Sequence, residues 1–390
     1  MGDVNGDWSE LPRCCVWKSN NFATKRILMK YLVSILLFTA IQVQLCAKII
    51  MTPYLQAVTT TSVYVLVECD KPDTVNILYG LTPAYGLIAK TEAAVLTTAK
   101  TPTWVHRILL QGLTPASKYY YQATQGKSIS KGAVFSTAVT RGMPFRMVWM
   151  ADCRTGTDVF ARISGDMAAA GPVVALYGGD LCHSSKYKSW KAEFFIKEQL
   201  NVASQVPFFN STGNHEGWEH NTRAFTQGPE SASGTQEYYS FDYGDLHVLC
   251  LNTMLPHGPG TPQFEFAVKD LAQSRQTWKI VISHVPAYCS GGHGEETDMV
   301  AMTREIFEPD KVDLVLTGHS HFFQHNLVNG IHHMVIGSAG APLHKPKKAA
   351  YTVAQAREHN FAVIDVSALK IKIAVYNEDM KLLDSLELAK

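Results

Sequence analysis

The chain has 390 residues, of which 46% are hydrophobic and 18% are charged, and its formal net charge is +1. This is the composition of a globular protein long enough for two domains, and it excludes a disordered or fibrous chain. The lysines and arginines are dispersed rather than gathered in a stripe, so neither nucleic acid nor an anionic membrane is implied as a partner.

Residues 1–47 have the pattern of a leader. Three basic residues precede an apolar run over 31–41, and the segment that follows ends in the small residue Ala47. This is the order of a secretory signal peptide, and the apolar run is too short to span a bilayer comfortably. We predict cleavage near Ala47 and a secreted or periplasmic protein without a stable membrane span, with Met29 as an alternative start. Leu45 before Cys46 disfavours a lipoprotein anchor.

Residues 48–140 are predicted to be all-β. Short alternating strands at 61–67, 75–79 and 105–110 are separated by turn residues, which indicates a β-sandwich. The stretch 112–121, Gly-Leu-Thr-Pro and then a run of tyrosines, resembles the corner of fibronectin type III domains, where a tyrosine hydroxyl bonds back to the main chain. We find no catalytic constellation in this part, and His106 on its strand is expected to be structural.

From residue 141 onward, strands and helices alternate. The apolar strands are predicted at 145–150, 173–178, 206–210, 246–252, 278–283 and 312–316, and the helices at 158–170, 188–201 and 264–274. This order implies a mainly parallel sheet covered on both faces. The tail is strand-rich, with runs at 333–336, 361–366, 371–376 and 382–388.

Five cysteines remain after the predicted cleavage. They are Cys69, Cys153, Cys182, Cys250 and Cys289. Their number is odd and their density low, so the protein is not a disulfide scaffold. A local bridge between Cys153 and Cys182 is one alternative, but we expect two small buried thiols.

A polar cluster follows each of five predicted strands. The clusters are Asp152-Cys153-Arg154, Gly179-Asp180-Leu181-Cys182-His183, Gly213-Asn214-His215-Glu216, Ser283-His284 and Gly318-His319-Ser320-His321. In a parallel sheet these strand ends open on one edge, so the side chains should converge in one crevice. Mixed nitrogen and oxygen donors suit zinc, iron or manganese better than calcium. A carboxylate at a strand end, such as Asp180, can bridge two cations roughly 3.5 to 4 Å apart.

These motifs, in this order, resemble the calcineurin-like metallophosphoesterases, and the preceding β-sandwich makes the chain similar to the purple acid phosphatases in particular. The resemblance covers roughly residues 53–375, and the stretch 238–244, Tyr-Tyr-Ser-Phe-Asp-Tyr-Gly, is also typical of the family. It implies an α/β fold, with an N-terminal fibronectin type III-like sandwich over 48–140. A metallophosphoesterase domain of two mixed sheets flanked by helices would follow over 141–390.

The resemblance also implies two divalent or mixed-valence transition metal ions (Fe, Zn or Mn) and a metal-bound hydroxide that attacks phosphorus. The first ion would be held by Asp152, Asp180, His183 and His321, and the second by Asp180, Asn214, His284 and His319. His215 would stabilise or protonate the leaving oxygen of a small phosphorylated substrate. His293 is a candidate second contact to the phosphate or leaving group, and its alternative is a solvated loop histidine.

Two positions depart from the purple acid phosphatases. His183 stands where the family has the tyrosine that gives it its colour, so we predict a colourless protein with a preference for divalent ions. Arg154 stands where the family has glycine, and a guanidinium cannot coordinate a cation. Arg154 either grips the substrate phosphate or turns outward to solvent or to a nearby acid.

Three functions follow from this sequence. The leading prediction is a secreted or periplasmic phosphomonoesterase. A phosphodiesterase acting on nucleotides or lipid head groups is the second, and a degenerate surface binding module the third. The chain has neither a P-loop nor a serine nucleophile elbow, which excludes those routes to phosphate or ester chemistry. The oligomeric state and the pH optimum are left open.

Overall fold

The computed structural model describes residues 47–390, so the predicted signal segment up to residue 46 lies outside the described residues. Within residues 47–390, none of the helices has the length and apolar character needed to cross a bilayer.

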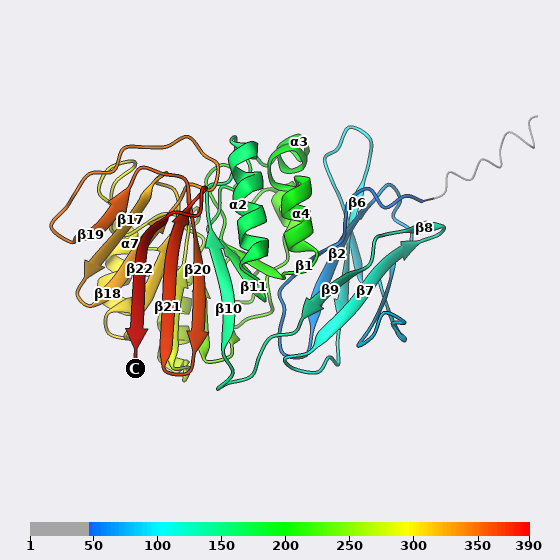
Figure 1. Ribbon diagram of the computed structural model, residues 1–390, viewed down its shortest axis with the longest axis horizontal. Coiled ribbons are helices and arrows are strands. Elements are labelled where there is room, and N and C mark those ends of the chain that lie inside the picture. The colour runs from blue at the N-terminus through cyan, green and yellow to red at the C-terminus, as the bar shows by residue number, and fades with distance from the viewer. Residues whose placement is uncertain (1–46) are drawn as a thin grey trace, which may run out of the picture. The chain divides into compact units, whose positions relative to one another are not determined.

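A ten-stranded sheet joins both ends of the described chain (Figure 1). Its four central strands, β10, β11, β12 and β1, are parallel, and every other neighbouring pair is antiparallel. In spatial order the strands are β22 (Leu382–Ala389), β21 (Lys370–Asn377), β20 (Asn360–Ser367), β10 (Phe145–Met150), β11 (Val174–Tyr177), β12 (Phe208–Asn210), β1 (Tyr54–Gln56), β2 (Val63–Cys69), β6 (Trp104–Leu110) and β5 (Ala93–Leu96).

A second, seven-stranded sheet lies against the first. Here β14, β15, β16 and β18 run parallel, and the flanking strands are antiparallel. In spatial order the strands are β13 (Tyr239–Tyr243), β14 (Leu246–Cys250), β15 (Trp278–Ile282), β16 (Leu314–Thr317), β18 (Ile331–Ile336), β17 (Phe323–Val328) and β19 (Thr352–Ala356). The mainly parallel sheet that the order of elements implied is therefore wrong, whereas the two mixed sheets that the resemblance implied are present. Each of the two mixed sheets contains four of the parallel strands.

The two sheets pack face to face and carry helices on their outer faces. Trp149 and Leu176 of the first sheet lie in one core with Val248 and Ile280 of the second. On the outer face of the first sheet lie α2 (Thr157–Ala169), α3 (Tyr187–Ser189) and α4 (Lys197–Ala203), of which α2 and α4 are seen over β10 and β11 in Figure 1. On the outer face of the second lie α6 (Pro262–Gln273) and α7 (Thr297–Met302), and α5 (His220–Phe225) follows β12. Strands buried on both faces explain the unbroken apolar runs of the sequence.

The predicted helix over 188–201 is broken. A π-helical segment, Trp190–Phe194, separates α3 from α4, and the Phe195 amide donates to the carbonyl of Trp190 at 2.9 Å. Ile196 is extended, with φ −68° and ψ 161°. The aromatic side chains explain the break, because the wider turn lets adjacent Phe194 and Phe195 both pack into the core, as a regular helix would not.

The N-terminal strands form two antiparallel layers. A third sheet of β4 (Leu87–Lys90), β3 (Asn76–Gly80), β7 (Lys118–Gln125) and β8 (Ser128–Ile129), with β9 (Ala133–Ser136) paired to β7, packs its buried side chains against those of β2 and β6. The Tyr119 hydroxyl accepts a hydrogen bond from the Thr114 amide at 3.0 Å, which is the expected return to the main chain. His106 is buried, and its ring contacts the Lys71 carbonyl at 3.0 Å, as suits a structural histidine.

The five described cysteines are free and buried, as expected from their number. The Cys153 thiol donates to the Leu181 carbonyl and the Cys182 thiol to the Ser184 carbonyl, so each has its own backbone partner.

Candidate metal centre

Three of the predicted site residues lie at the carboxyl ends of parallel strands in strained backbone conformations. Asp152 follows β10, Asp180 follows β11 and His319 follows β16, with φ values of 56°, 52° and 66°. Non-glycine residues rarely adopt such left-handed values, and they persist where the surrounding structure enforces them. Both aspartates are buried, so the strain holds two carboxylates at one point between the sheets.

Two glycines allow the loops of the centre to approach each other. A Cβ on Gly213 would lie 2.1 Å from the Asp180 amide nitrogen, and one on Gly318 would lie 2.3 Å from Oδ2 of Asp152. Neither side chain can be accommodated, because real Cβ atoms do not approach so closely. The glycines of these two motifs therefore set the spacing of the site rather than contacting a ligand.

Three polar atoms surround Nε2 of His284 at the second predicted cation position. Nε2 of His284 lies 3.0 Å from Oδ1 of Asn214, 3.2 Å from Nδ1 of His319 and 3.4 Å from Oδ1 of Asp180. The opposite nitrogen of His284 donates to the carbonyl of Gly178 at 2.8 Å, which leaves a lone pair on Nε2 in the neutral ring. The lone pairs of His284, Asn214 and Asp180 thus face one another, and a cation between them satisfies all three. These residues fit a metal ion.

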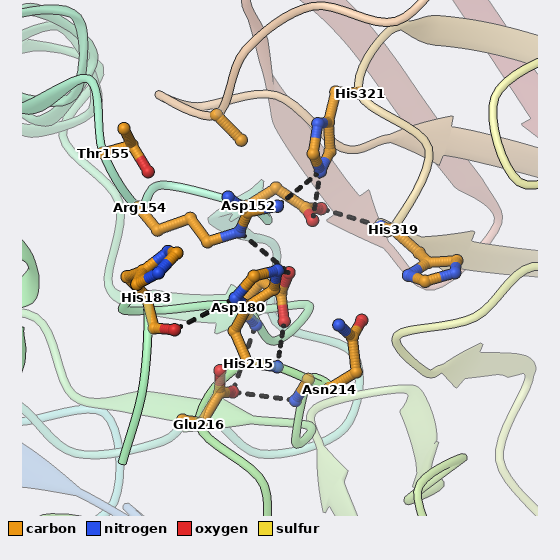
Figure 2. A network of polar contacts seen from close by, with 12 residues as sticks. Asp152, Arg154, Thr155, Asp180, His183, Asn214, His215, Glu216, His319 and His321 are labelled. Atoms are coloured by element: carbon orange, nitrogen blue, oxygen red, sulfur yellow. Dashed lines mark hydrogen bonds and ion pairs between the residues drawn. The ribbon is translucent and has the colours of Figure 1, made fainter. Parts of the chain in front are cut away.

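The first predicted position is different. Donor atoms of Asp152, Asp180 and His321 all lie within 4.8 Å of one another, and Oδ1 of Asp152 is buried without a hydrogen-bond partner among the described residues. However, Nε of Arg154 lies 3.1 Å from Oδ2 of Asp180, and a terminal nitrogen of Arg154 lies 3.3 Å from Nε2 of His321. Figure 2 shows the Arg154 side chain reaching from its loop to both. A positive group already engages these donors, so this position does not fit a second metal ion.

The surroundings favour the ionised carboxylate of Asp180 and the neutral ring of His319. Burial alone would raise the pKa of Asp180, but His284, the His215 amide and the Arg154 guanidinium outweigh burial and hold this pKa below its usual range. Burial raises the pKa of Asp152. Burial, with His284 and His293 nearby, lowers the pKa of His319 to about 2, so its ring is neutral, the form in which imidazole binds metal.

Comparison with known proteins identifies this part of the chain. Residues 146–323 match the family model of the calcineurin-like phosphoesterases. They form a calcineurin-like phosphoesterase domain. The match runs from β10 to the start of β17 and so contains all the motifs around Asp180.

The relatives found are purple acid phosphatases. The chain is 26% identical to purple acid phosphatase 21 of Arabidopsis thaliana over 56% of this chain and 53% of that protein. It is also 26% identical to the Fe(3+)-Zn(2+) purple acid phosphatase 12 of the same plant, over 59% and 56%. The solved structure of purple acid phosphatase PPD1 from yellow lupin superposes with a TM-score of 0.77 at 20% identity, covering 88% of this chain and 74% of that one. The chain spans about half the length of the curated relatives that it matches.

The phosphoesterase domain does not bring the His183 side chain into the group of Asp152, Asp180 and His321. The His183 side chain is exposed, and its ring centroid lies 5.2 Å from that of His215. The backbone of His183, rather than its side chain, makes the hydrogen bonds to neighbouring residues of the site. The His183 amide donates to Glu193 at 2.9 Å, and its carbonyl accepts from Nδ1 of His215 at 3.0 Å.

The two histidines predicted to contact substrate both lie at the centre. Nε2 of His215 is 3.8 Å from Oδ2 of Asp180, and the His215 side chain is partly exposed. His293 is exposed and stacks on His319, with ring centroids 4.1 Å apart, while its amide donates to the Ser320 hydroxyl. His293 therefore lies beside the second cation position with an exposed ring, and its contact with substrate stays a prediction.

Three residues that sequence reasoning missed complete the site. Glu216 is buried and accepts from the Asp180 and Gly213 amides, which ties two strand-end loops together. Its place at the end of the Gly-Asn-His-Glu motif could have revealed it. Glu193 lies on the π-helical segment, and the His344 ring stacks on His321 at 3.9 Å. Neither has a sequence signal, since both come from segments without a motif.

Proposed function

We propose that this chain is a phosphomonoesterase whose catalytic centre lies between Asp180, Asn214, His284 and His319. The observation that carries the proposal is the meeting of Nε2 of His284 with oxygens of Asn214 and Asp180 at the second cation position, inside a calcineurin-like phosphoesterase domain. A transition metal ion held there supplies Lewis-acid polarisation of a phosphoryl oxygen. The first position does not fit a second ion, because Arg154 already engages Asp180 and His321.

The chain's own residues supply the remaining functions. His215 is oriented by the bond from its Nδ1 to the His183 carbonyl, so its Nε2 faces Asp180 and the crevice, where it can hold a proton for the leaving oxygen. The guanidinium of Arg154 has more N–H groups than the two that Asp180 and His321 use, and these can bind phosphate oxygens. His293 stands at the open side of the centre as a further phosphate contact.

A comparison of two chromogenic substrates tests this proposal. The full chain, supplied with Zn²⁺, Mn²⁺ or Fe²⁺, should hydrolyse p-nitrophenyl phosphate faster than bis-p-nitrophenyl phosphate, and a chelator should abolish both rates. Faster cleavage of the diester would favour the phosphodiesterase alternative. No hydrolysis of either, with the metal still bound, would favour the degenerate binding module.

The proposal extends to the export of the protein and to the fold of its N-terminal part. We propose that the protein is secreted or periplasmic and that residues 48–140 are a fibronectin type III-like module. The order of residues in the leader supports export, and the two antiparallel layers with the Tyr119 hydrogen bond support the module. Mass spectrometry of the mature protein should find Lys48 as its first residue, and a first residue within 1–30 would contradict export by this signal.

A further inference from the structure

We propose that Arg154 takes the place of the first metal ion, so that the centre holds one transition metal ion at the second position and a permanent guanidinium charge at the first. The inference rests on the proposed function only in assuming that the second position binds a metal ion. It differs from the two-ion centre that the resemblance implies.

The donors of the first position are already used by Arg154. His321 donates through Nδ1 to the carbonyl of Pro342 at 2.8 Å, so the neutral ring has only the lone pair on Nε2 left to bind a metal ion. That lone pair faces the terminal nitrogen of Arg154 at 3.3 Å, and Oδ2 of Asp180 faces Nε of Arg154 at 3.1 Å. Each contact places an N–H opposite an acceptor, which is the arrangement of a satisfied guanidinium rather than of an open metal site.

Charge opposes a metal ion beside this guanidinium. The Arg154 side chain is 11% exposed and that of Asp180 is 1% exposed, so solvent screens the pair poorly. Arginine does not release its proton in proteins. At about 4 Å and an effective dielectric constant near 20, two positive charges repel strongly enough to weaken binding roughly a thousandfold.

The backbone holds Arg154 in this place. The next residue, Thr155, has a φ of 75°, and its amide donates to Glu193 at 3.0 Å. On the other side of the loop, a Cβ on Gly340 would lie 2.4 Å from the Cys153 carbonyl, and one on Gly156 would lie 2.3 Å from the Gly340 carbonyl. A loop packed this closely on both sides holds the backbone of Arg154 beside the first position.

The ligand atoms that remain free at the first position are too few to bind a transition metal ion. Oδ1 of Asp152 lies 3.4 Å from Nε2 of His321 and is the one carboxylate oxygen of Asp152 and Asp180 without a hydrogen-bond partner in the described part of the chain. Oδ2 of Asp152 accepts from the His319 amide, and the Asp180 oxygens accept from the His215 amide and from Arg154. The fourth predicted ligand, His183, has an exposed side chain outside this group. A single carboxylate oxygen is far below the three or four ligands of transition-metal sites.

The test is the metal content per chain, measured by inductively coupled plasma mass spectrometry. The full chain is loaded with excess Zn²⁺ or Mn²⁺ and freed of unbound ions. The wild type should hold close to one ion per chain, and Arg154→Gly should hold close to two. Arg154→Lys keeps the charge and should stay near one. Arg146→Gly is the matched control, because Arg146 pairs with Asp365 on the surface and should leave the content at one. Circular dichroism checks that each variant is folded.

Each outcome decides the inference. Two ions in the wild type, or one in a folded Arg154→Gly variant, would overturn it. So would a single ion that survives Asn214→Ala and is lost in His321→Ala, because that ion would occupy the first position. One ion in a wild type that hydrolyses no phosphoester would leave this inference standing and refute the proposed function. Two ions in an active wild type would do the reverse, and no bound ion would overturn both.

Discussion

The two predicted cation positions are lined by similar residues, but Arg154 engages the donor atoms of only one of them. At the second position, oxygen atoms of Asn214 and Asp180 lie 3.0 and 3.4 Å from Nε2 of His284, and Arg154 makes no hydrogen bond to any of these three atoms. At the first, Asp152, Asp180 and His321 converge as tightly, but Arg154 supplies the positive charge. The comparison teaches that a set of ligating residues is not yet a metal site, because a neighbouring side chain decides whether their lone pairs are free.

The largest effect is expected at the second position. Asn214→Ala removes a donor that no other described residue replaces, and we expect loss of the bound ion and about a thousandfold loss in kcat/KM. Asn201→Ala, an exposed asparagine at α4, is the matched control and should be neutral. Phosphatase assays with metal analysis measure both. If the Asn214→Ala variant kept both its metal ion and its activity, the second position would not be the metal site, and the contrast between the two positions would be wrong.

A smaller effect is expected at the first position. His321→Ala removes an acceptor of Arg154 but no ligand of the second ion, so kcat/KM should fall only about tenfold, with the metal content unchanged. The same assays apply. If His321→Ala loses an ion as Asn214→Ala does, the first position binds metal after all.

Glu193 tests how firmly the Arg154 loop must be held. Glu193→Ala leaves the Thr155 and His183 amides without their acceptor, and loosening of this loop should lower kcat/KM about threefold to tenfold while the ion at the second position is kept. Glu198→Ala, on the exposed face of α4, is the control. An unchanged rate in a folded Glu193→Ala variant would show that these two hydrogen bonds do not position Arg154.

A still smaller effect is expected from the side chain of His183. Because that side chain is exposed and only its backbone holds His215, His183→Ala should change kcat/KM by no more than about twofold. His183→Tyr loaded with Fe³⁺ should stay colourless while Arg154 is present. Strong visible absorption by that variant would place residue 183 on a metal ion and Arg154 away from it.

The last test measures how pH changes the free energy of unfolding, through a histidine outside the metal centre. His247 lies between Asp242 and Asp270, and although burial lowers its pKa, the hydrogen bonds to these two carboxylates raise it to about 9. An unfolded histidine titrates near 6.5, so this stabilisation is complete below about pH 6.5 and is lost as the pH rises through 9. Urea unfolding should show a fall of at most about 3 kcal/mol over that window. In the His247→Gln variant, the free energy of unfolding should vary less with pH over this window. A variation as large as that of the wild type would contradict the role of His247.

Much of the fold and of the site follows from local patterns. The sequence predicts β10 to its residue bounds, because every residue of this strand except Arg146 is apolar and buried. The motifs after β10, β11, β15 and β16 were predicted to meet because parallel strands end at one edge. That the strands divide between two facing sheets depends on long-range pairing, which the order of elements does not show.

The orientation of single side chains could not be predicted. Whether Arg154 faces phosphate, solvent or an acid depends on Thr155, Glu193 and Gly340, which fix its loop from three distant parts of the sequence. His183 turns outward for a similar reason, since its amide and carbonyl are both engaged. The break at Phe195 also depends on tertiary packing, because it serves two aromatic side chains that face the same core.

The parallel pairing of β1 with β12, at Gln56 and Phe208, has a consequence for how the molecule unfolds. β12 leads directly into the loop that carries Asn214, and β1 covers what would otherwise be the open edge of its sheet. The N-terminal strands and the phosphoesterase domain should therefore melt as one cooperative unit. Without residues 48–140, the edge of β12 would be unpaired and could template aggregation, so the N-terminal strands protect the strand that leads to Asn214.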